Sequence, residues 1–311
     1  MYLASIITLS VILLYLIAPG AQKSTRATSS AKVSSANTQQ ANDSRLLEIG
    51  NETRTNKTAH VRPTEIKILS YNIRWRSGDD LKKLIKFFRD DPEIGSASIM
   101  GLQEVDRRKK RSGNTNTARL IAEELRMNYA WAAPPSAKDE QEEETGVAIM
   151  SVYPLSDIRR IVLPHEGPNR RRRVALGATI NVEGREWRVY SAHADNRVSV
   201  EKKIDQMDAV LKDLAKYPPQ MPAIVVGDLN TWELDADDRT IKLFSAAGLK
   251  TPFGGDSTFM RKVLVVPIKF RLDWVWLRGI ESTSFGIDKT IDVSDHWPLW
   301  TNLKLPSTTA K

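Results

Sequence analysis

Two short polar motifs lie beside apolar runs in the C-terminal half of the sequence. Val226-Gly227-Asp228-Leu229-Asn230 places a carboxylate and an amide at the end of one run, and Ser294-Asp295-His296-Trp297-Pro298 places a carboxylate and an imidazole just before another. Carboxylate and amide oxygens are the ligands that hard divalent cations prefer, and imidazole and carboxylate groups transfer protons at moderate pH. The combination is what metal-assisted hydrolysis of a phosphoester requires.

The same kinds of residue recur at the ends of other predicted strands. Asn72, Glu104 and His193 each follow an apolar run, and Asp273 precedes one. If the strands that end and those that begin at these positions are antiparallel, all of these side chains lie on one rim of the sheets. Polar residues are common at strand ends as turn formers, so the identity of the groups, rather than their position, favours a site.

Strands must therefore hold these groups, and helices must cover the strands. Short β-rich runs predict strands over residues 66–71, 98–102, 147–151, 174–180, 187–192, 223–226, 274–277 and 298–303. Apolar residues at helical spacing predict helices over residues 79–89 and 200–214, and a third around Ile241 and Phe244 that ends near Gly248.

Length and composition limit the class of protein. The chain has 311 residues and 41% hydrophobic residues, enough for one catalytic domain with a full core. It has no cysteine, which excludes disulfides, thiol nucleophiles and cysteine-bound zinc. The formal net charge is +8, and residues 22–62 contribute seven basic and three acidic side chains, or +4 of it. The rest of the chain is only mildly basic.

The N-terminal part differs in character from the rest. Residues 2–18 form an unbroken run of apolar and small residues, about 26 Å long as a helix and slightly short of a bilayer of ~30 Å. We therefore predict a signal peptide or membrane anchor over residues 1–21. We predict a disordered polar linker over residues 22–64 and the catalytic domain over residues 65–311.

The predicted location is extracytoplasmic, either secreted or tethered to the membrane by the N-terminal segment. Lys23, Arg26 and Lys32 follow the apolar run and no basic residue precedes it. For an uncleaved anchor, the positive-inside tendency would keep the domain cytoplasmic, so this feature opposes the predicted location.

Six motifs together resemble a known family. They are Leu69-Ser70-Tyr71-Asn72-Ile73-Arg74, Leu102-Gln103-Glu104-Val105-Asp106, Ser191-Ala192-His193, Gly227-Asp228-Leu229-Asn230, Arg271-Leu272-Asp273-Trp274 and Ser294-Asp295-His296. In this order, over residues 65–305, the sequence resembles the endonuclease/exonuclease/phosphatase superfamily, which has the deoxyribonuclease-I-like fold. The resemblance implies an α/β class fold: a four-layered α/β sandwich of two mixed, mainly antiparallel sheets flanked by helices, with the site at one edge.

The resemblance also implies a metal end of the site. Glu104 would be the principal ligand of a divalent cation, and Asn72 and Asp295 would complete or support its binding. Oxygen ligands without cysteine favour Mg²⁺, with Mn²⁺ as a substitute. Arg74 stands where repair-type abasic endonucleases usually place an acidic residue, which argues against a dedicated abasic-site enzyme.

The resemblance assigns catalytic roles to five further residues. Asp228 would orient or deprotonate the attacking water, and Asn230 would hydrogen-bond the phosphate. His193 would donate a hydrogen bond to a phosphoryl oxygen or protonate the leaving group, although the neighbouring Ala194 replaces a larger apolar residue. His296 would act either as a base or as an electrostatic clamp on the phosphate, with its ring oriented by Asp273.

The sequence thus predicts a Mg²⁺-dependent phosphoester hydrolase, most simply a phosphodiesterase or endonuclease that cleaves nucleic acid by in-line attack of water. Basic runs at residues 107–111 and 170–173, and Trp75, Trp232 and Trp297, are candidate contacts for nucleic acid. The alternative is a phosphatase or lipid phosphodiesterase acting on phosphoinositides or sphingolipids, with the N-terminal segment at a membrane. A non-catalytic adaptor ranks last because all six motif positions are filled, and no obligate protein partner is indicated.

Overall fold

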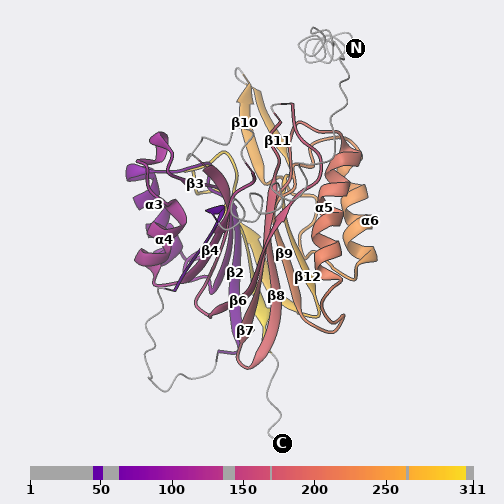
Figure 1. Cartoon of the computed structure of the whole chain (residues 1–311), viewed down its shortest axis with the longest axis horizontal. Coiled ribbons are helices and arrows are strands. Elements are labelled where there is room, and N and C mark those ends of the chain that lie inside the picture. Colours follow the sequence, from indigo (N-terminus) through magenta and orange to yellow (C-terminus); the bar gives the residue numbers. More distant parts are fainter. Residues whose placement is uncertain (1–44, 52–62, 136–143, 169, 264–265, 306–311) are drawn as a thin grey trace, which may run out of the picture. The chain divides into compact units, whose positions relative to one another are not determined.

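The computed structural model describes residues 45–51, 63–135, 144–168, 170–263 and 266–305. The predicted N-terminal segment, residues 1–21, and most of the predicted linker lie outside these ranges. Within them, no helix has the length and apolar character needed to cross a bilayer. The domain formed by the described residues is shown in Figure 1.

Two sheets form the centre of the domain. The larger has seven strands in the order β1 (Leu47–Gly50), β4 (Asn128–Ala132), β5 (Glu144–Ser151), β3 (Ile99–Arg107), β2 (Glu65–Asn72), β14 (Leu299–Lys304) and β13 (Ser282–Ile287). The smaller has five, in the order β12 (Asp273–Arg278), β9 (Ala223–Asp228), β8 (Arg185–His193), β7 (Val174–Val182) and β6 (Leu155–Val162). The neighbours β2 and β3, and β8 and β9, are parallel, and the other neighbouring pairs are antiparallel. A separate hairpin is formed by β10 (Phe259–Val263) and β11 (Val266–Phe270).

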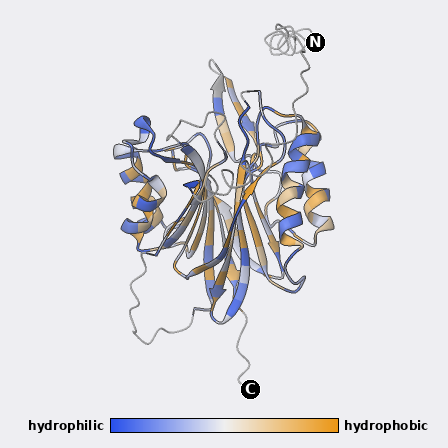
Figure 2. Cartoon of the chain, viewed as in Figure 1, coloured by the Kyte–Doolittle hydropathy of each residue, from blue (hydrophilic) through white to orange (hydrophobic). Residues whose placement is uncertain are grey.

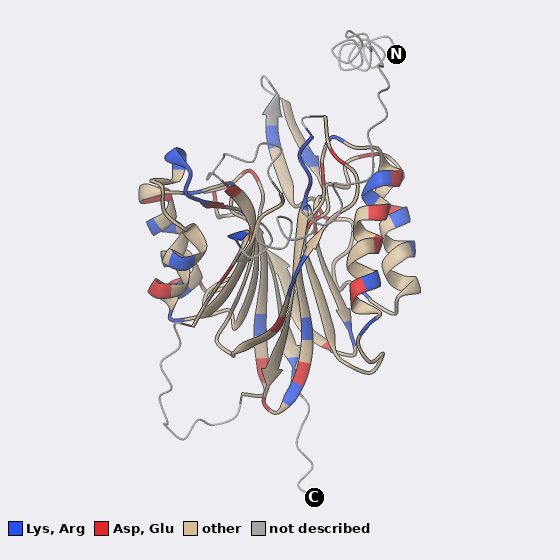
Figure 3. Cartoon of the chain, viewed as in Figure 1, with Lys and Arg blue, Asp and Glu red and all other residues tan. Residues whose placement is uncertain are grey.

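Helices cover the outer face of each sheet. On one side of Figure 1 lie α3 (Gly78–Asp90) and α4 (Thr117–Leu125), and on the other lie α5 (Val200–Leu214) and α6 (Ala236–Ala246). A short 3₁₀ helix, η1 (Lys110–Ser112), precedes α4. In α3, the apolar residues Leu81, Leu84, Ile85 and Phe88 are all buried, because helical spacing places them on one face. The helices are apolar toward the sheets and polar outward (Figure 2), and their outer surfaces carry mixed charges while the strands between carry few (Figure 3). The predicted four-layered sandwich is confirmed.

The core between the two sheets holds them close together. Ile68 and Ile149 from the larger sheet and Val226 and Val275 from the smaller one belong to the same buried cluster, and each such side chain stabilises the fold by about 1.5–3 kcal/mol. A Cβ atom on Gly101 would lie 2.2 Å from Cγ2 of Val226. The absence of a side chain there lets β3 approach β9, the two strands that carry Glu104 and Asp228.

The predicted linker is too long at its C-terminal end. Leu47–Gly50 forms β1, which pairs antiparallel with β4 at the edge of the larger sheet, and Leu46 is buried. Residues 45–51 therefore belong to the domain, because they pair with β4 and bury Leu46, although Ile49 is 50% exposed and the stretch is embedded in a polar tract. All eight predicted strands and the three predicted helices are present. The elements not predicted are β1, η1, α4, β4, β6, β10, β11 and β13.

Candidate active site

Strand pairing brings the predicted residues to one rim of the sandwich. Asn72, His193 and Asp228 are the last residues of β2, β8 and β9, and Asp273 is the first residue of β12. Asp228 pairs in register with both His193 and Asp273, since β9 is parallel to β8 and antiparallel to β12. His296 lies just before β14, which is antiparallel to β2, and so reaches the end of β2 that carries Asn72.

Asp228 is at the centre of this group. Its Oδ2 atom accepts a hydrogen bond of 2.9 Å from Asn72 Nδ2, and its Oδ1 atom accepts one of 3.0 Å from the backbone N–H of Asn230. The Nε2 atoms of His193 and His296 lie 3.5 and 3.7 Å from Oδ2. Gly227 precedes it with φ of +150°, and a Cβ there would lie 1.9 Å from the carbonyl oxygen of Ala192. Only glycine fits at that position, which explains the first residue of the Gly-Asp motif.

The surroundings of Asp228 favour its protonated form. Burial raises the pKa of Asp228 to about 7, and the negative charges of Asp273 and Glu104 act in the same direction against the lowering influence of His296 and Asn72. A carboxylate with a pKa near neutrality can both accept and return a proton at neutral pH. Asp228 is thus suited to act on a water molecule.

His296 is held in its protonated form. Its Nδ1 lies 2.8 Å from Asp273 Oδ2, which also accepts a 2.7 Å hydrogen bond from Thr258 Oγ1. Burial alone would lower the pKa of His296, but the charges of Asp273, Asp228 and Asp295 outweigh it and raise the pKa to about 10. An imidazolium donates from both nitrogens and accepts no proton, so this environment suits a clamp on a phosphate oxygen rather than a base.

His193 is as buried as His296 but stays neutral. Arg173 Nη1 lies 3.4 Å from its Nδ1, and because a guanidinium only donates, Nδ1 accepts and the ring proton is on Nε2, facing Asp228. Burial is the main cause that holds the pKa of His193 well below its usual value, and the charges of Arg173 and His296 act in the same direction. Sequence reasoning placed Arg173 only in a basic run and missed this contact.

The loop after β9 is fixed by a residue that the sequence analysis also missed. Lys203 on α5 is 1% exposed, and its Nζ donates to the carbonyl oxygen of Asn230 at 2.7 Å and to both carboxylate oxygens of Glu233 at 2.6 and 2.7 Å. Asn230 has φ of +53°, and its Nδ2 donates to the carbonyl oxygen of Ala194 at 2.9 Å. An amide nitrogen has two hydrogens, so one remains for a phosphate oxygen.

Glu104 does not lie at the exit of a strand, contrary to the expectation from the sequence. β3 continues to Arg107 through a β-bulge between Gln103 and Val105, with φ of +55° at Glu104. The bulge turns the residue out of the regular pleat, as bulges near active sites often do. Among the described residues, no hydrogen-bond or ion-pair partner approaches the Glu104 carboxylate, and its charge reaches Asp228.

Asn72 lies beside Glu104, and the segment that carries Asp295 reaches Asn72 through a 2.8 Å hydrogen bond from Ser294 Oγ to the carbonyl oxygen of Asn72. Asn72 is in register with Gln103, and the backbone N–H of Trp75 donates to the carbonyl oxygen of Glu104 at 2.9 Å. The Oδ1 atom of Asn72 accepts from the backbone N–H of Arg74 at 3.0 Å and keeps a second lone pair. Together with the carboxylate of Asp295 these are hard oxygen donors, so the residues fit a divalent cation such as Mg²⁺.

A second group of donors is less suited to a cation. Ligand atoms of Asp228, Asp273 and His296 lie within 4.8 Å of one another. Asp273 and His296 are already bonded to each other, and a protonated imidazole has no lone pair for a metal. In this hydrogen-bonded state the group is less suited to a cation than the oxygen donors of Glu104, Asn72 and Asp295.

Some of the basic residues and tryptophans that the sequence offered as nucleic-acid contacts are buried. Arg107 is 4% exposed and pairs with Glu144 at 2.9 Å and Glu48 at 3.1 Å, so it supports the fold and cannot grip a polyanion. Trp297 is buried, whereas Trp232 is 48% exposed. In the other run, Arg170 and Arg171 are exposed.

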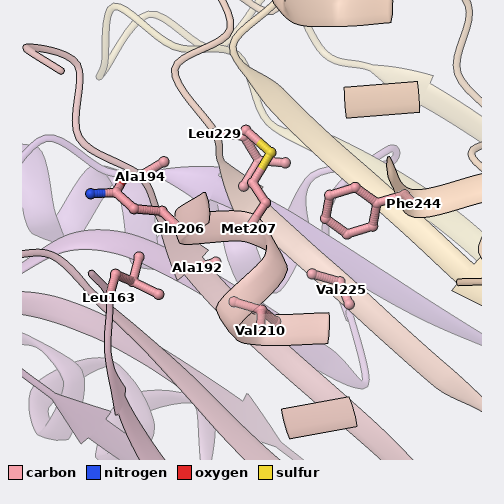
Figure 4. A pocket seen from close by; sticks show the side chains of 9 residues that line it. All are labelled: Leu163, Ala192, Ala194, Gln206, Met207, Val210, Val225, Leu229 and Phe244. Carbon is pink, nitrogen blue, oxygen red and sulfur yellow. The ribbon is translucent and has the colours of Figure 1, made fainter. Parts of the chain in front are cut away.

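Ala194, the small residue noted after His193, lines an apolar cavity beneath α5 (Figure 4). Leu229, Met207 and Phe244 are among its other walls, and its volume is about 10 Å³. A cavity of that size holds at most one water molecule. The cavity is too small for a substrate.

Comparisons with known proteins agree with this geometry. A family model described as Endonuclease/Exonuclease/phosphatase family matches residues 69–296. An endonuclease/exonuclease/phosphatase from Beutenbergia cavernae DSM 12333 is similar in structure, with a TM-score of 0.62 and 18% identity over 78% of this chain and 72% of that one. A family protein from Leptotrichia buccalis C-1013-b is also similar, with a TM-score of 0.60 and 17% identity over 77% of this chain and 100% of that one. D. rerio TDP2 complexed with a single-strand DNA product has a TM-score of 0.59 and 14% identity over 78% of this chain and 100% of that one. A comparison with curated protein sequences finds no match.

Proposed function

The chain belongs to the Endonuclease/Exonuclease/phosphatase family, and from that premise we propose that it is a Mg²⁺-dependent phosphodiesterase that cleaves nucleic acid. Members of the family are hydrolases that act on phosphoester bonds and typically use divalent metals. One observation carries the proposal. A carboxylate with a pKa near 7, Asp228, lies within 3.7 Å of a charged and a neutral imidazole, His296 and His193. The charge of Glu104, whose carboxylate has no hydrogen-bond or ion-pair partner among the described residues, reaches Asp228.

The residues divide the work of hydrolysis among them. Asp228, held by Asn72, accepts the proton of the attacking water, and His296, held by Asp273, donates to a phosphoryl oxygen and balances its charge. Neutral His193 donates a hydrogen bond from Nε2 to a second phosphoryl oxygen or to the leaving-group oxygen and keeps its proton. A cation bound by Glu104, Asn72 and Asp295 would polarise the phosphoryl oxygen and neutralise developing charge.

The rate acceleration that phosphoester hydrolysis needs is too large for any one of these residues to supply alone. Phosphoester hydrolysis needs accelerations at or above the top of the usual range of ~10⁶ to 10¹⁷, and one positioned acid or base supplies only about 10² to 10⁴. Two such groups leave most of the acceleration to be supplied by charge stabilisation and in-line positioning. The proposal therefore depends on Glu104 as much as on the histidines.

Nucleic acid is the proposed substrate class because of charge and exposed aromatic surface. Arg170 and Arg171 are exposed near the strand that follows them, and Trp232 offers an exposed ring beside the Asn230 loop. Similar structures include TDP2 with a single-strand DNA product, although at 14% identity that likeness speaks only for the fold. A phosphatase or lipid phosphodiesterase is the second candidate, favoured by the apolar N-terminal run, which also underlies the proposed extracytoplasmic location.

The test is an assay of the full chain with and without Mg²⁺ on four substrates: plasmid DNA, RNA, phospholipid vesicles and inositol phosphates. We expect cleavage of DNA or RNA that is lost on chelation and restored by Mg²⁺ or Mn²⁺. The His296→Ala variant should lose at least tenfold in rate, as expected for a missing acid-base group. Hydrolysis of vesicles or inositol phosphates without cleavage of DNA or RNA would refute nucleic acid as the substrate class and favour the second candidate. Cleavage that a chelator does not affect would refute the metal dependence.

A further inference from the structure

One arginine already occupies part of the proposed metal end. Arg74 Nη1 lies 3.0 Å from Oδ2 of Asp295, and the two side chains are 41% and 20% exposed. Arg74 has φ of +48°, in a turn held by the Oδ1 atom of Asn72 and by the carbonyl oxygen of Glu104. The turn that presents Arg74 is thus built on the other two proposed cation ligands.

A guanidinium and a divalent cation compete for the same carboxylate. Each needs the oxygen lone pairs of Asp295, and their like charges repel each other at short range. Resting on the proposed function, we infer that Arg74 neutralises Asp295 when no cation is bound, and that cation binding displaces its guanidinium so that it can bind the phosphate of the substrate. Arg74 would then make substrate binding follow cation binding.

The neighbouring arginines do not share this property. Arg76 pairs with Asp80 at the start of α3, and Arg111 binds Asp106 through two hydrogen bonds. Neither partner is a proposed cation ligand, so a cation would leave both pairs intact. Of these three arginines, Arg74 is the one whose partner, Asp295, is a proposed cation ligand. Its side chain is partly exposed and therefore has room to move. Once released, its planar fork of donors matches a phosphate.

The inference predicts opposite effects of one substitution on two ligands. In Arg74→Met, Mn²⁺ binding without substrate should tighten by up to about fivefold, the worth of an exposed ion pair, as measured by electron paramagnetic resonance titration of the full chain. The KM for a single-stranded oligonucleotide in saturating Mg²⁺ should rise by about tenfold or more, the worth of a charge-assisted hydrogen bond. A merely structural defect would weaken both.

Two further variants separate the steps. Lys83→Met removes the ion pair between Lys83 and Asp292, which lies at 2.6 Å on the same segment as Asp295 but involves no proposed ligand. It should leave both the Mn²⁺ affinity and the KM unchanged. Arg74→Lys keeps a cation beside Asp295 but loses the fork, so its Mn²⁺ affinity should stay near that of the unaltered chain while its KM rises.

The outcomes distinguish this inference from the proposed function. If the unaltered chain binds Mn²⁺ and Arg74→Met binds it equally or more weakly, then the cation does not displace Arg74 from Asp295. The inference is refuted and the hydrolase proposal stands. If Mn²⁺ binds more tightly but the KM is unchanged, Arg74 does not reach the phosphate, and the inference is likewise wrong. If neither protein binds Mn²⁺, both this inference and the metal dependence are refuted.

Discussion

Replacing Asp273 by Asn removes one charge from the site while keeping a side chain of the same size. Asp273 Oδ2 accepts from His296 Nδ1 at 2.8 Å and from Thr258 Oγ1 at 2.7 Å. An asparagine oxygen accepts both hydrogen bonds, so the ring of His296 keeps its position. The substitution therefore tests the charge of Asp273 separately from the geometry that it supports.

The expected magnitude follows from the pKa of His296. Its rise from 6.5 to about 10 corresponds to roughly 5 kcal/mol in favour of the charged form, at 1.36 kcal/mol for each pKa unit. Asp273 is the largest favourable cause, and two unit charges about 4 Å apart at an effective dielectric constant of about 20 attract by ~4 kcal/mol. Removing it should lower the pKa of His296 by about three units, to roughly 7. The pKa of Asp228 is subject to two opposed changes, because the charge of His296, which the substitution weakens, lowers it and the charge of Asp273 raises it.

The assay is the pH dependence of kcat/KM for bis(p-nitrophenyl) phosphate in Mg²⁺, which reports the groups of the free enzyme. The unaltered chain should rise through a pKa near 7, as Asp228 loses its proton, and fall through a pKa near 10, as His296 does. In Asp273→Asn the alkaline limb moves to lower pH. At pH 9 the rate should be roughly a hundredfold lower, since only about 1% of His296 stays charged at a pKa near 7.

The same substitution should change how stability depends on pH. A raised pKa means that the folded state favours the protonated form, so the contribution of His296 is fully present below about 6.5 and is lost as the pH rises through about 10. The Tm of the unaltered chain should therefore fall more steeply over this window than that of Asp273→Asn. Asp292→Asn, at an exposed ion pair, is the control and should change neither profile. An unmoved alkaline limb in Asp273→Asn, or a pKa near 6.5 for His296 by NMR in the unaltered chain, would refute the reasoning.

Three further substitutions probe the rest of the site. Glu104→Gln should weaken Mn²⁺ binding at least tenfold while leaving the metal-free Tm unchanged or higher, because the carboxylate has no protein partner in the described chain and repels Asp228; a lower metal-free Tm would argue for a structural role. Arg173→Met should raise the pKa of His193 in an NMR titration and lower kcat at neutral pH by about tenfold, since the guanidinium sets the tautomer; an unmoved pKa would contradict this. Gly227→Ala should destabilise the fold by ~2 kcal/mol or more in a denaturant titration, because its Cβ would lie 1.9 Å from a backbone oxygen. Gly254→Ala, with no atom within 4 Å of its Cβ, is the matched control.

Local pattern was enough for the residues that end or begin a strand. Asn72, His193 and Asp228 are readable because a polar side chain follows a run of buried apolar residues, and strand register then places them together. The residues that hold them have no such signal. Arg173 is hidden in a basic run 20 positions before His193, and Thr258 lies 15 positions before Asp273, so only the folded chain reveals these contacts.

The missed strands lack the usual sequence pattern of a strand, each for a different reason. In β6, none of the eight residues is fully buried, so the apolar alternation that marks a strand is weak. In β4 all five residues are buried, but Asn128 and the alanines have low β-propensity. β1 is four residues long and lies in a tract whose average composition is polar. The bulge at Glu104 was likewise invisible, since one extra residue in a strand leaves no mark in a run of apolar letters.

Protonation states are the part of the site that residue type cannot supply. His193 and His296 are the same amino acid, are 5% and 6% exposed, and both lie within 3.7 Å of Asp228. Burial lowers the pKa of each, so the difference between a neutral and a charged ring comes from their neighbours, of which Arg173 has the largest effect on the first and Asp273 the largest on the second. The sequence left His296 open as base or clamp because nothing in its own motif records that Asp273, 23 positions away, pairs with Nδ1. The assignment of roles in this site is therefore a property of the fold, which places one guanidinium and one carboxylate against two otherwise equivalent rings.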